Sequence, residues 1–209
     1  MTNDPLEIER HTLQFYNQNI KEFYEHTVGL DLSAWHAPFL ALLPPGGRIL
    51  DAGCGSGRDS RRFLQMGYRV TAFDASPTMV EHATQLTGLP VRNLRFQDVN
   101  YEEEFDGVWA CASLLHIPKN EILNAVSPLV RALKPGGIFY ASFRFGAQET
   151  YQDERIFNNY TEDTFRELVG HLPELSILSI QLTQDTRPER AEMLWLHGIV
   201  RKVMVVDSL

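Results

Sequence analysis

The stretch Ile49-Leu50-Asp51-Ala52-Gly53-Cys54-Gly55-Ser56-Gly57 joins an apolar run to three glycines at alternate positions. Glycine permits a tight turn and allows a ligand to press against backbone N–H groups. A helical pattern and a second β-rich run follow, and Asp74 closes that run twenty-one residues after Gly53. An acidic side chain in this place can accept hydrogen bonds from ribose hydroxyls. The order of strand, glycine loop, helix, strand and acid therefore predicts a nucleotide-binding site.

From Arg48 onward, short β-branched or aromatic runs alternate with helical patterns, as in a parallel sheet with crossover helices. The helix expected at 77–87 has Ser76 as its N-cap and Pro77 in its first turn. We predict an α/β fold with a Rossmann-like, doubly wound, mainly parallel seven-stranded sheet. The expected strands lie near 48–52, 69–73, 92–96, 106–111 and 137–143, and the expected helices near 57–66, 77–87 and 119–133.

The two ends of the chain depart from this alternation. Thr161-Glu162-Asp163 predicts an acidic cap for a helix through about Leu168, and the apolar runs 175–182 and 192–205 predict a carboxy-terminal antiparallel strand pair. Before the first strand, Leu13, Tyr16, Ile20 and Tyr24 fall at helical spacing and predict an amphipathic helix over part of the sheet. We expect one domain over 1–209, with amino-terminal helices over 1–45 and the Rossmann-like core over 46–209.

Composition limits the classes of partner and compartment. The formal net charge of −8 argues against a nucleic-acid partner, because phosphate binding draws on a basic surface. The chain shows neither a signal-peptide pattern nor an apolar stretch long enough to span a bilayer, so we expect a cytoplasmic protein without a membrane partner. Cys54 and Cys111 predict free thiols rather than a disulfide framework. The histidines show no metal-ligand spacing, so no metal is expected. We expect the chain to be a monomer or to form a homodimer.

The details of the glycine loop discriminate between nucleotides. The dinucleotide fingerprint is Gly-x-Gly-x-x-Gly, which leaves room for a pyrophosphate. Here the third glycine comes one residue early, and the carboxylate of Asp51 stands where it suits a ligand with an ammonium group. Such a site disfavours a pyrophosphate.

These residues resemble the first motif of the class I S-adenosylmethionine-dependent methyltransferases, and the resemblance extends over nearly the whole chain. Phe105-Asp106-Gly107-Val108-Trp109 looks like the fourth strand of that family, and Leu133-Lys134-Pro135-Gly136-Gly137 like the turn before its fifth. The resemblance implies S-adenosylmethionine as cofactor and S-adenosylhomocysteine as its product. It also implies that the glycine loop holds the methionine part, Asp74 the ribose and Asp98 the adenine. The implied cofactor contacts are Tyr16, Asp51, Gly53, Gly55, Gly57, Arg58, Asp74, Ala75, Met79, Asp98, Val99 and Ser113. Arg58 and the Ser113-Leu114-Leu115-His116 segment further resemble small bacterial methyltransferases of the tellurite-resistance and small-molecule type.

Three residues are candidates for the acceptor side. His116 follows the fourth strand, where open α/β sheets place substrate groups, and is the best general-base candidate; alternatively it caps a helix or binds a loop carbonyl. Arg144 follows the fifth strand and Tyr160 precedes the next helix; a solvated arginine and a core tyrosine are equally good descriptions. We expect direct in-line transfer of a methyl group to a small-molecule acceptor. The alternatives are a non-catalytic S-adenosylmethionine sensor and an NAD-dependent oxidoreductase.

Overall fold

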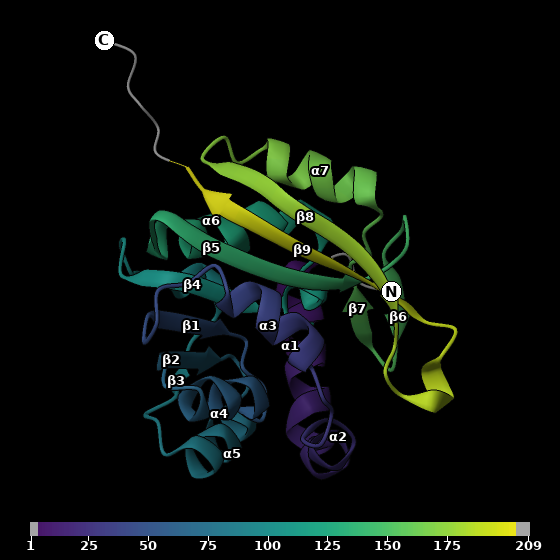
Figure 1. Ribbon diagram of the computed structural model, residues 1–209. Helices are drawn as coiled ribbons and strands as arrows, with labels where there is room; N and C mark the ends of the chain where they lie inside the picture. Colours follow the sequence, from purple (N-terminus) through teal and green to yellow (C-terminus); the bar gives the residue numbers. More distant parts are fainter. Residues whose placement is uncertain (1–3, 204–209) are drawn as a thin grey trace.

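The strand before the glycine loop, β1 (Arg48–Ala52), lies inside a seven-stranded sheet. In the computed structural model, which describes residues 4–203, this sheet has the order β3-β2-β1-β4-β5-β9-β8 (Figure 1). The parallel strands are β1, β2 (Arg69–Asp74), β3 (Arg92–Asn93), β4 (Phe105–Ala110) and β5 (Leu133–Arg144). β9 (Leu194–Lys202) is antiparallel to β5 and to β8 (Leu175–Gln184). The predicted doubly wound fold with its antiparallel pair is confirmed.

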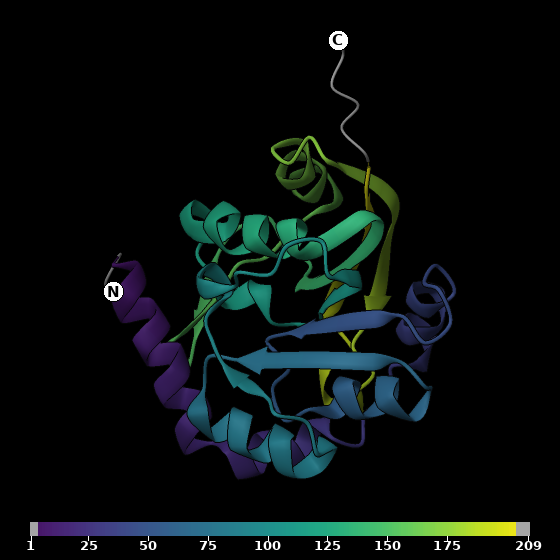
Figure 2. The same ribbon diagram turned by 90° about the vertical axis from the view of Figure 1, so that its left-hand side faces the viewer.

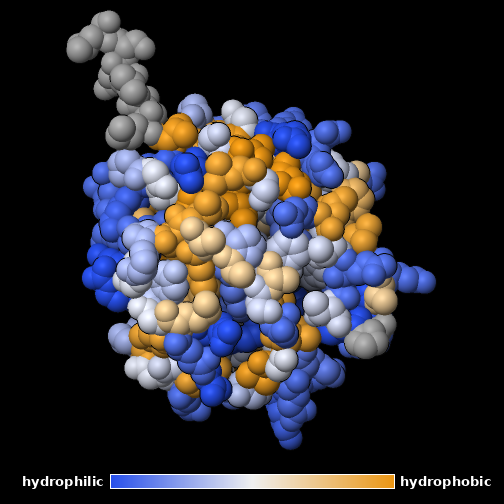
Figure 3. Space-filling model, in the orientation of Figure 1, coloured by the Kyte–Doolittle hydropathy of each residue, from blue (hydrophilic) through white to orange (hydrophobic). Residues whose placement is uncertain are grey.

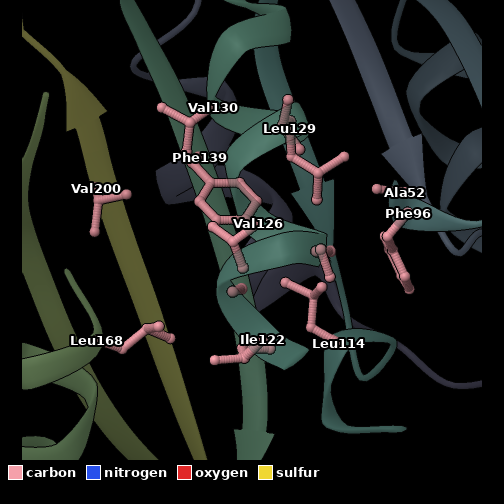
Figure 4. Close-up of a cluster of buried hydrophobic side chains, with 14 of the residues drawn as sticks. Ala52, Phe96, Leu114, Ile122, Val126, Leu129, Val130, Phe139, Leu168 and Val200 are labelled. Atoms are coloured by element: carbon pink, nitrogen blue, oxygen red, sulfur yellow. The ribbon is translucent and has the colours of Figure 1, made fainter. Parts of the chain in front are cut away.

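Helices cover both faces of the sheet. On one face, α3 (Ser33–Leu40) and α4 (Arg58–Gln65) bring Phe39 and Phe63 against Trp109 and Tyr140. On the other, α6 (Ile122–Ala132) and α7 (Glu162–Gly170) pack on the alternate side chains of the strands. Figure 4 shows apolar side chains of α6 beside Phe139 of β5. Because both faces are covered, the central strands are apolar along nearly their whole length.

Local capping sets the bounds of two helices. α5 (Pro77–Thr87) begins where predicted, because Ser76 Oγ accepts a hydrogen bond from the Met79 N–H at 3.2 Å. It ends at Gly88, whose φ of 72° places the backbone in the left-handed region. The predicted cap of α7 is also found, since the Thr161 side chain accepts from the Thr164 N–H. Each of these caps involves residues only a few positions apart, so it can be predicted from the sequence.

The amino-terminal part differs from the prediction of a single amphipathic helix through residues 13–24. α1 (Pro5–Gln18) ends at Asn19, whose side-chain amide and backbone N–H both donate to the Phe15 carbonyl, and α2 (Ile20–Thr27) starts anew. α1 contacts α5 and β7 (Arg155–Phe157) and lies beside the carboxyl ends of the parallel strands (Figure 2). The sheet face itself is covered by α3. The division at residue 45 stays a prediction.

Two strand predictions need correction, and one hairpin was not predicted. β3 covers only 92–93 of the expected 92–96, because Phe96 leaves the ladder in a short 3₁₀ helix, η1 (Phe96–Asp98), and packs on Phe73. β5 starts at Leu133, and a register shift opposite 105–107 accommodates the Lys-Pro-Gly-Gly segment. β6 (Thr150–Gln152) and β7 form an unexpected hairpin. Further 3₁₀ turns are η2 (Leu114–His116), η3 (Lys119–Glu121) and η4 (Pro188–Arg190). Residues 204 and 205 of the predicted last run lie outside the described residues.

The surface over β8 and β9 keeps some apolar side chains. Leu178, Leu182 and Leu194 are exposed there, and Figure 3 shows apolar surface in this region. None of the helices in residues 4–203 is both long and apolar enough to cross a membrane.

Candidate functional site

A cavity of about 560 Å³ follows the edge of the sheet at which the parallel strands end. β9 runs the opposite way, so its first residues reach the same edge: Trp195 pairs with Arg144 at the end of β5, and Leu194 with Gln184 at the end of β8. α1 and the β6–β7 hairpin add residues to the outer wall. Open α/β sheets bind ligands at this edge, near the point where the crossovers change direction, here between β1 and β4.

The glycine loop forms the floor of the cavity between β1 and α4. The N–H groups of Gly53 and Cys54 both donate to the Phe73 carbonyl at 3.0 Å, which holds the loop against the end of β2. Gly53 has a φ of +70°, and a Cβ on it would lie 2.6 Å from the Cβ of Ser113. Only glycine fits here, because the turn needs a left-handed backbone and Ser113, in the segment after β4, approaches closely.

Asp74 closes β2 and binds the same loop. One carboxylate oxygen accepts from the Gly55 N–H and the other from the Ser76 N–H, each at 2.9 Å. Burial raises the pKa of Asp74, and the backbone N–H groups of Ser76, Gly55 and Ala75 oppose this shift. Each oxygen keeps a second lone pair for a ligand in the cavity.

Asp51 is a buried carboxylate at the other side of the loop. It accepts from Ser60 Oγ at 2.6 Å, and its pKa is raised by burial and by the nearby carboxylate of Asp59. Asp59 itself is paired: Arg58 donates to both of its oxygens, and Trp109 Nε1 and His36 Nε2 also bind it. Asp51 therefore lines the cavity as a carboxylate that an added cation would stabilise.

Tyr16 and His116 face each other across the cavity wall. The Tyr16 hydroxyl lies 2.7 Å from His116 Nε2, and His116 Nδ1 lies 2.9 Å from the Ile156 carbonyl. A carbonyl only accepts, so Nδ1 carries the proton and Nε2 accepts from Tyr16. Burial, followed by repulsion from Arg155 and Arg144, lowers the pKa of His116 to about 3. The imidazole is thus held neutral and its free nitrogen is occupied.

Most of the residues expected at the site lie together on the lining of this cavity. They come from α1, from the ends of β1, β2, β4 and β5, and from the first turns of α4 and α5. They are Tyr16, Asp51, Gly53, Gly55, Arg58, Asp74, Ala75, Met79, Ser113, His116 and Arg144.

Three of the expected cofactor residues lie elsewhere. Gly57 faces α5, where a Cβ would be 3.0 Å from the Ala83 Cα, so its role is helix packing. The Asp98 carboxylate turns outward and binds Arg95, while Val99 is a core side chain whose N–H donates to Phe96. Their neighbours Phe96 and Gln97 line the cavity instead.

The placement of Tyr160 in the acceptor pocket is wrong. Its ring is buried in the core, with its centroid 4.5 Å from that of Phe143, and its hydroxyl accepts from Asn158 Nδ2 at 3.3 Å. Tyr160 is therefore a core tyrosine, which was the alternative interpretation.

The sequence reasoning missed several cavity residues. Arg155 and Phe157 reach the cavity on the β6–β7 hairpin, Trp35 on α3 and Trp195 on β9. The hairpin has a weak signal in Asp153-Glu154, two turn residues with positive φ between short runs of β-formers. His197 is buried and bound by Tyr140 and Thr183, and it also lines the cavity.

Sequence comparison finds relatives over the part of the chain that carries the glycine loop. Residues 49–137 match the methyltransferase domain family. The chain is 33% identical over 145 residues to the putative methyltransferase YqeM of Bacillus subtilis, covering 61% of this chain and 58% of that protein. It is 37% identical over 154 residues to the 2-methyl-6-phytyl-1,4-hydroquinone methyltransferase of Synechocystis, covering 68% and 45%. The chain thus spans about half the length of these curated relatives.

Structure comparison extends the likeness to the whole fold. The 1,6-didemethyltoxoflavin-N1-methyltransferase of Burkholderia thailandensis, solved with 1,6-didemethyltoxoflavin and S-adenosylhomocysteine, superposes with a TM-score of 0.78. The match covers 98% of this chain and 92% of that one at 23% sequence identity. At this identity the likeness concerns the fold.

Proposed function

We propose that this chain, which carries the methyltransferase domain sequence at residues 49–137, is a class I S-adenosylmethionine-dependent methyltransferase that transfers a methyl group to a small-molecule acceptor. One observation carries the proposal. A single continuous cavity joins the glycine loop and Asp74 to the wall formed by Tyr16, His116 and Arg144. A cofactor and an acceptor in that cavity would lie side by side, as direct transfer requires.

The residues around the loop fit S-adenosylmethionine. Asp51 is a buried carboxylate with a raised pKa and matches the ammonium group of a methionine moiety. The second lone pairs of Asp74 match two ribose hydroxyls. Because Gly53 has no Cβ, the side chains of Phe96 and Ser113 can pack directly against the glycine loop. Asp98 would have to leave Arg95 to reach an adenine, so its assignment depends on that rearrangement.

The bound cofactor would supply a methyl group on a sulfonium, which is electrophilic without help from a metal or a covalent intermediate. The protein has to align the acceptor atom with the S–CH₃ bond and to exclude water. Aromatic side chains around the cavity, among them Tyr16, Phe157 and Trp195, provide such a wall. The named activities of the relatives, on a hydroquinone and on 1,6-didemethyltoxoflavin, support a small acceptor here. The finer likeness to tellurite-resistance methyltransferases stays a prediction.

Calorimetric titration tests the cofactor. We expect saturable binding of S-adenosylhomocysteine and none of NADH; the reverse pattern would establish an oxidoreductase instead. An acceptor screen that measures S-adenosylhomocysteine formed from S-adenosylmethionine then tests the reaction. Formation at only the spontaneous rate throughout the screen, despite tight cofactor binding, would favour the non-catalytic sensor.

A further inference from the structure

Four arginines line the part of the cavity beyond β4, on the side away from β2. Arg144 ends β5, Arg155 begins β7, and Arg187 and Arg190 belong to the connection between β8 and β9. The chain as a whole carries a formal charge of −8, so a basic composition does not account for the cluster. We call these four residues the arginine wall.

The carboxylates around the arginine wall neutralise only part of its charge. Arg187 is fully paired, because Asp185 accepts from its Nε at 2.8 Å and from Nη2 at 2.6 Å. Arg155 has one contact with Asp153, at 3.2 Å, and that carboxylate is 56% exposed. Arg144 and Arg190 have no ion pair within residues 4–203. The wall therefore keeps an excess of positive charge.

Two of these guanidinium groups retain unused donors. The Nε atoms of Arg144 and Arg155 are buried and have no hydrogen-bond partner. Arg144 Nη1 donates to the neutral Gln152 side chain at 3.2 Å. Buried donors without a partner are costly, so these two positions call for an acceptor that the described residues do not supply.

Aromatic rings fix the orientation of the same two groups. The guanidinium carbon of Arg144 lies 3.4 Å from the centroid of Phe157, and that of Arg155 lies 3.5 Å from the centroid of Phe15. Stacking occupies one face of each guanidinium and leaves the Nε–H at its edge, which has no partner, for a planar acceptor. A carboxylate matches that edge with two parallel hydrogen bonds.

The cations also repel one another. Burial, then the charges of Arg190 and Arg155, lower the pKa of Arg144 to about 10. Repulsion of this kind is relieved when an anion enters, because opposite charge favours the charged form of the arginines. A cavity wall of one sign further concentrates ligands of the opposite sign.

We propose that the arginine wall binds the methyl acceptor as an organic anion, with a carboxylate or equivalent acidic group accepting hydrogen bonds from Arg144 and Arg155. This inference rests on the proposed methyltransferase function and names its substrate class. Trp195 and Phe157 line the cavity beside the wall, which suits an acid with an aromatic body.

Benzoate and benzamide are matched probes for this site, since they share size and shape and differ in charge. Calorimetry with the protein saturated with S-adenosylhomocysteine is expected to show binding of benzoate and at least about tenfold weaker binding of benzamide. Equal affinity for the two, or no binding of benzoate at millimolar concentration, would overturn the proposal.

Arginine variants locate the binding. Arg144→Gln and Arg155→Gln are each expected to weaken benzoate binding about tenfold or more, as loss of a charge-assisted hydrogen bond implies. Arg166→Gln removes the same charge from the exposed face of α7 and is the control, with wild-type benzoate affinity expected. Benzoate binding that survives in both wall variants would place the anion elsewhere.

Two further measurements keep the outcomes separate. Thermal unfolding of each variant shows whether it is folded. Titration of the apo protein with S-adenosylhomocysteine tests the cofactor independently. If the apo protein binds benzoate but not S-adenosylhomocysteine, the proposed function alone is refuted. If it binds S-adenosylhomocysteine but not benzoate, the anionic acceptor alone is refuted.

Discussion

The Tyr16 hydroxyl donates a hydrogen bond of 2.7 Å to Nε2 of His116, although the two residues are one hundred positions apart in the sequence. The Ile156 carbonyl holds the other ring nitrogen protonated. We propose that His116 orients Tyr16 at the cavity wall, because Nε2, the nitrogen that could act as a base, is occupied by the Tyr16 hydroxyl.

The role of His116 can be separated from general-base catalysis by its pH profile. His116→Ala is expected to leave S-adenosylhomocysteine affinity near normal and to slow turnover about tenfold, less than the loss typical of a general base. Because the pKa of His116 is lowered to about 3, the wild-type rate is expected to show no step near the ordinary histidine value. Initial rates of an identified acceptor against pH provide the measurement.

Two companion variants decide whether His116 acts through Tyr16. Tyr16→Phe is expected to match His116→Ala, and His116→Gln, which can still accept from the hydroxyl, is expected to restore part of the rate. A rate step near the ordinary histidine pKa that disappears in His116→Ala would instead assign proton transfer to the imidazole.

Asp74→Ala is expected to weaken S-adenosylhomocysteine binding by about 1.5 to 3 kcal/mol, because it removes charge-assisted hydrogen bonds to two hydroxyls. Calorimetric titration measures this change. Asp163→Ala, in the exposed first turn of α7, removes the same charge outside the cavity and should bind as wild type does. Unchanged affinity in Asp74→Ala would show that this acid does not hold the ribose.

Gly53→Ala combines an unfavourable backbone with a collision, since its φ is +70° and the new Cβ would meet Ser113 at 2.6 Å. The expected loss in the free energy of unfolding is about 2 to 4 kcal/mol. Gly67→Ala is the matched control: its φ is +85°, but nothing lies within 4 Å of the added Cβ. It should lose only about 1 to 2 kcal/mol in urea unfolding. Equal losses in both variants would mean that the close approach to Ser113 has no cost.

His197 predicts sensitivity of the fold to acid. Burial lowers its pKa in the folded protein to about 4, so the unfolded chain binds a proton first as the pH falls below the ordinary value. Stability is therefore complete above that value and is lost on acidification. Between roughly pH 8 and pH 5, the buried His197 ring is expected to lower the free energy of unfolding by about 2 kcal/mol.

His197→Gln tests this assignment by urea unfolding at the two pH values. At the higher pH the variant is expected to be less stable than wild type, because the stack on Trp35 is lost. On acidification its free energy of unfolding is expected to fall by about 2 kcal/mol less than that of wild type. His171→Gln, just after α7 on the surface, is the control and should keep the wild-type pH dependence. An unchanged slope in His197→Gln would refute the assignment.

Local sequence determined the central fold and the floor of the cavity. The glycine loop, the acid at the end of β2 and the cap at Ser76 are short-range features, because turn geometry, strand period and capping act within a few residues. They were sufficient for the doubly wound sheet and for the grouping of Asp51, Gly53 and Asp74 at one edge.

Tertiary structure alone decided the opposite wall. Arg155 reaches the cavity because a short hairpin folds back beside α1, and Trp195 because β9 runs against β5. Tyr160 precedes α7 and Asp98 follows β3, as expected, yet the Tyr160 ring turns into the core and the Asp98 carboxylate pairs with Arg95. Such placements depend on packing and charge between segments far apart in the chain, which no local pattern contains. Sequence thus indicated a methyl-donor site, and only the assembled arginine wall indicated the charge of the acceptor.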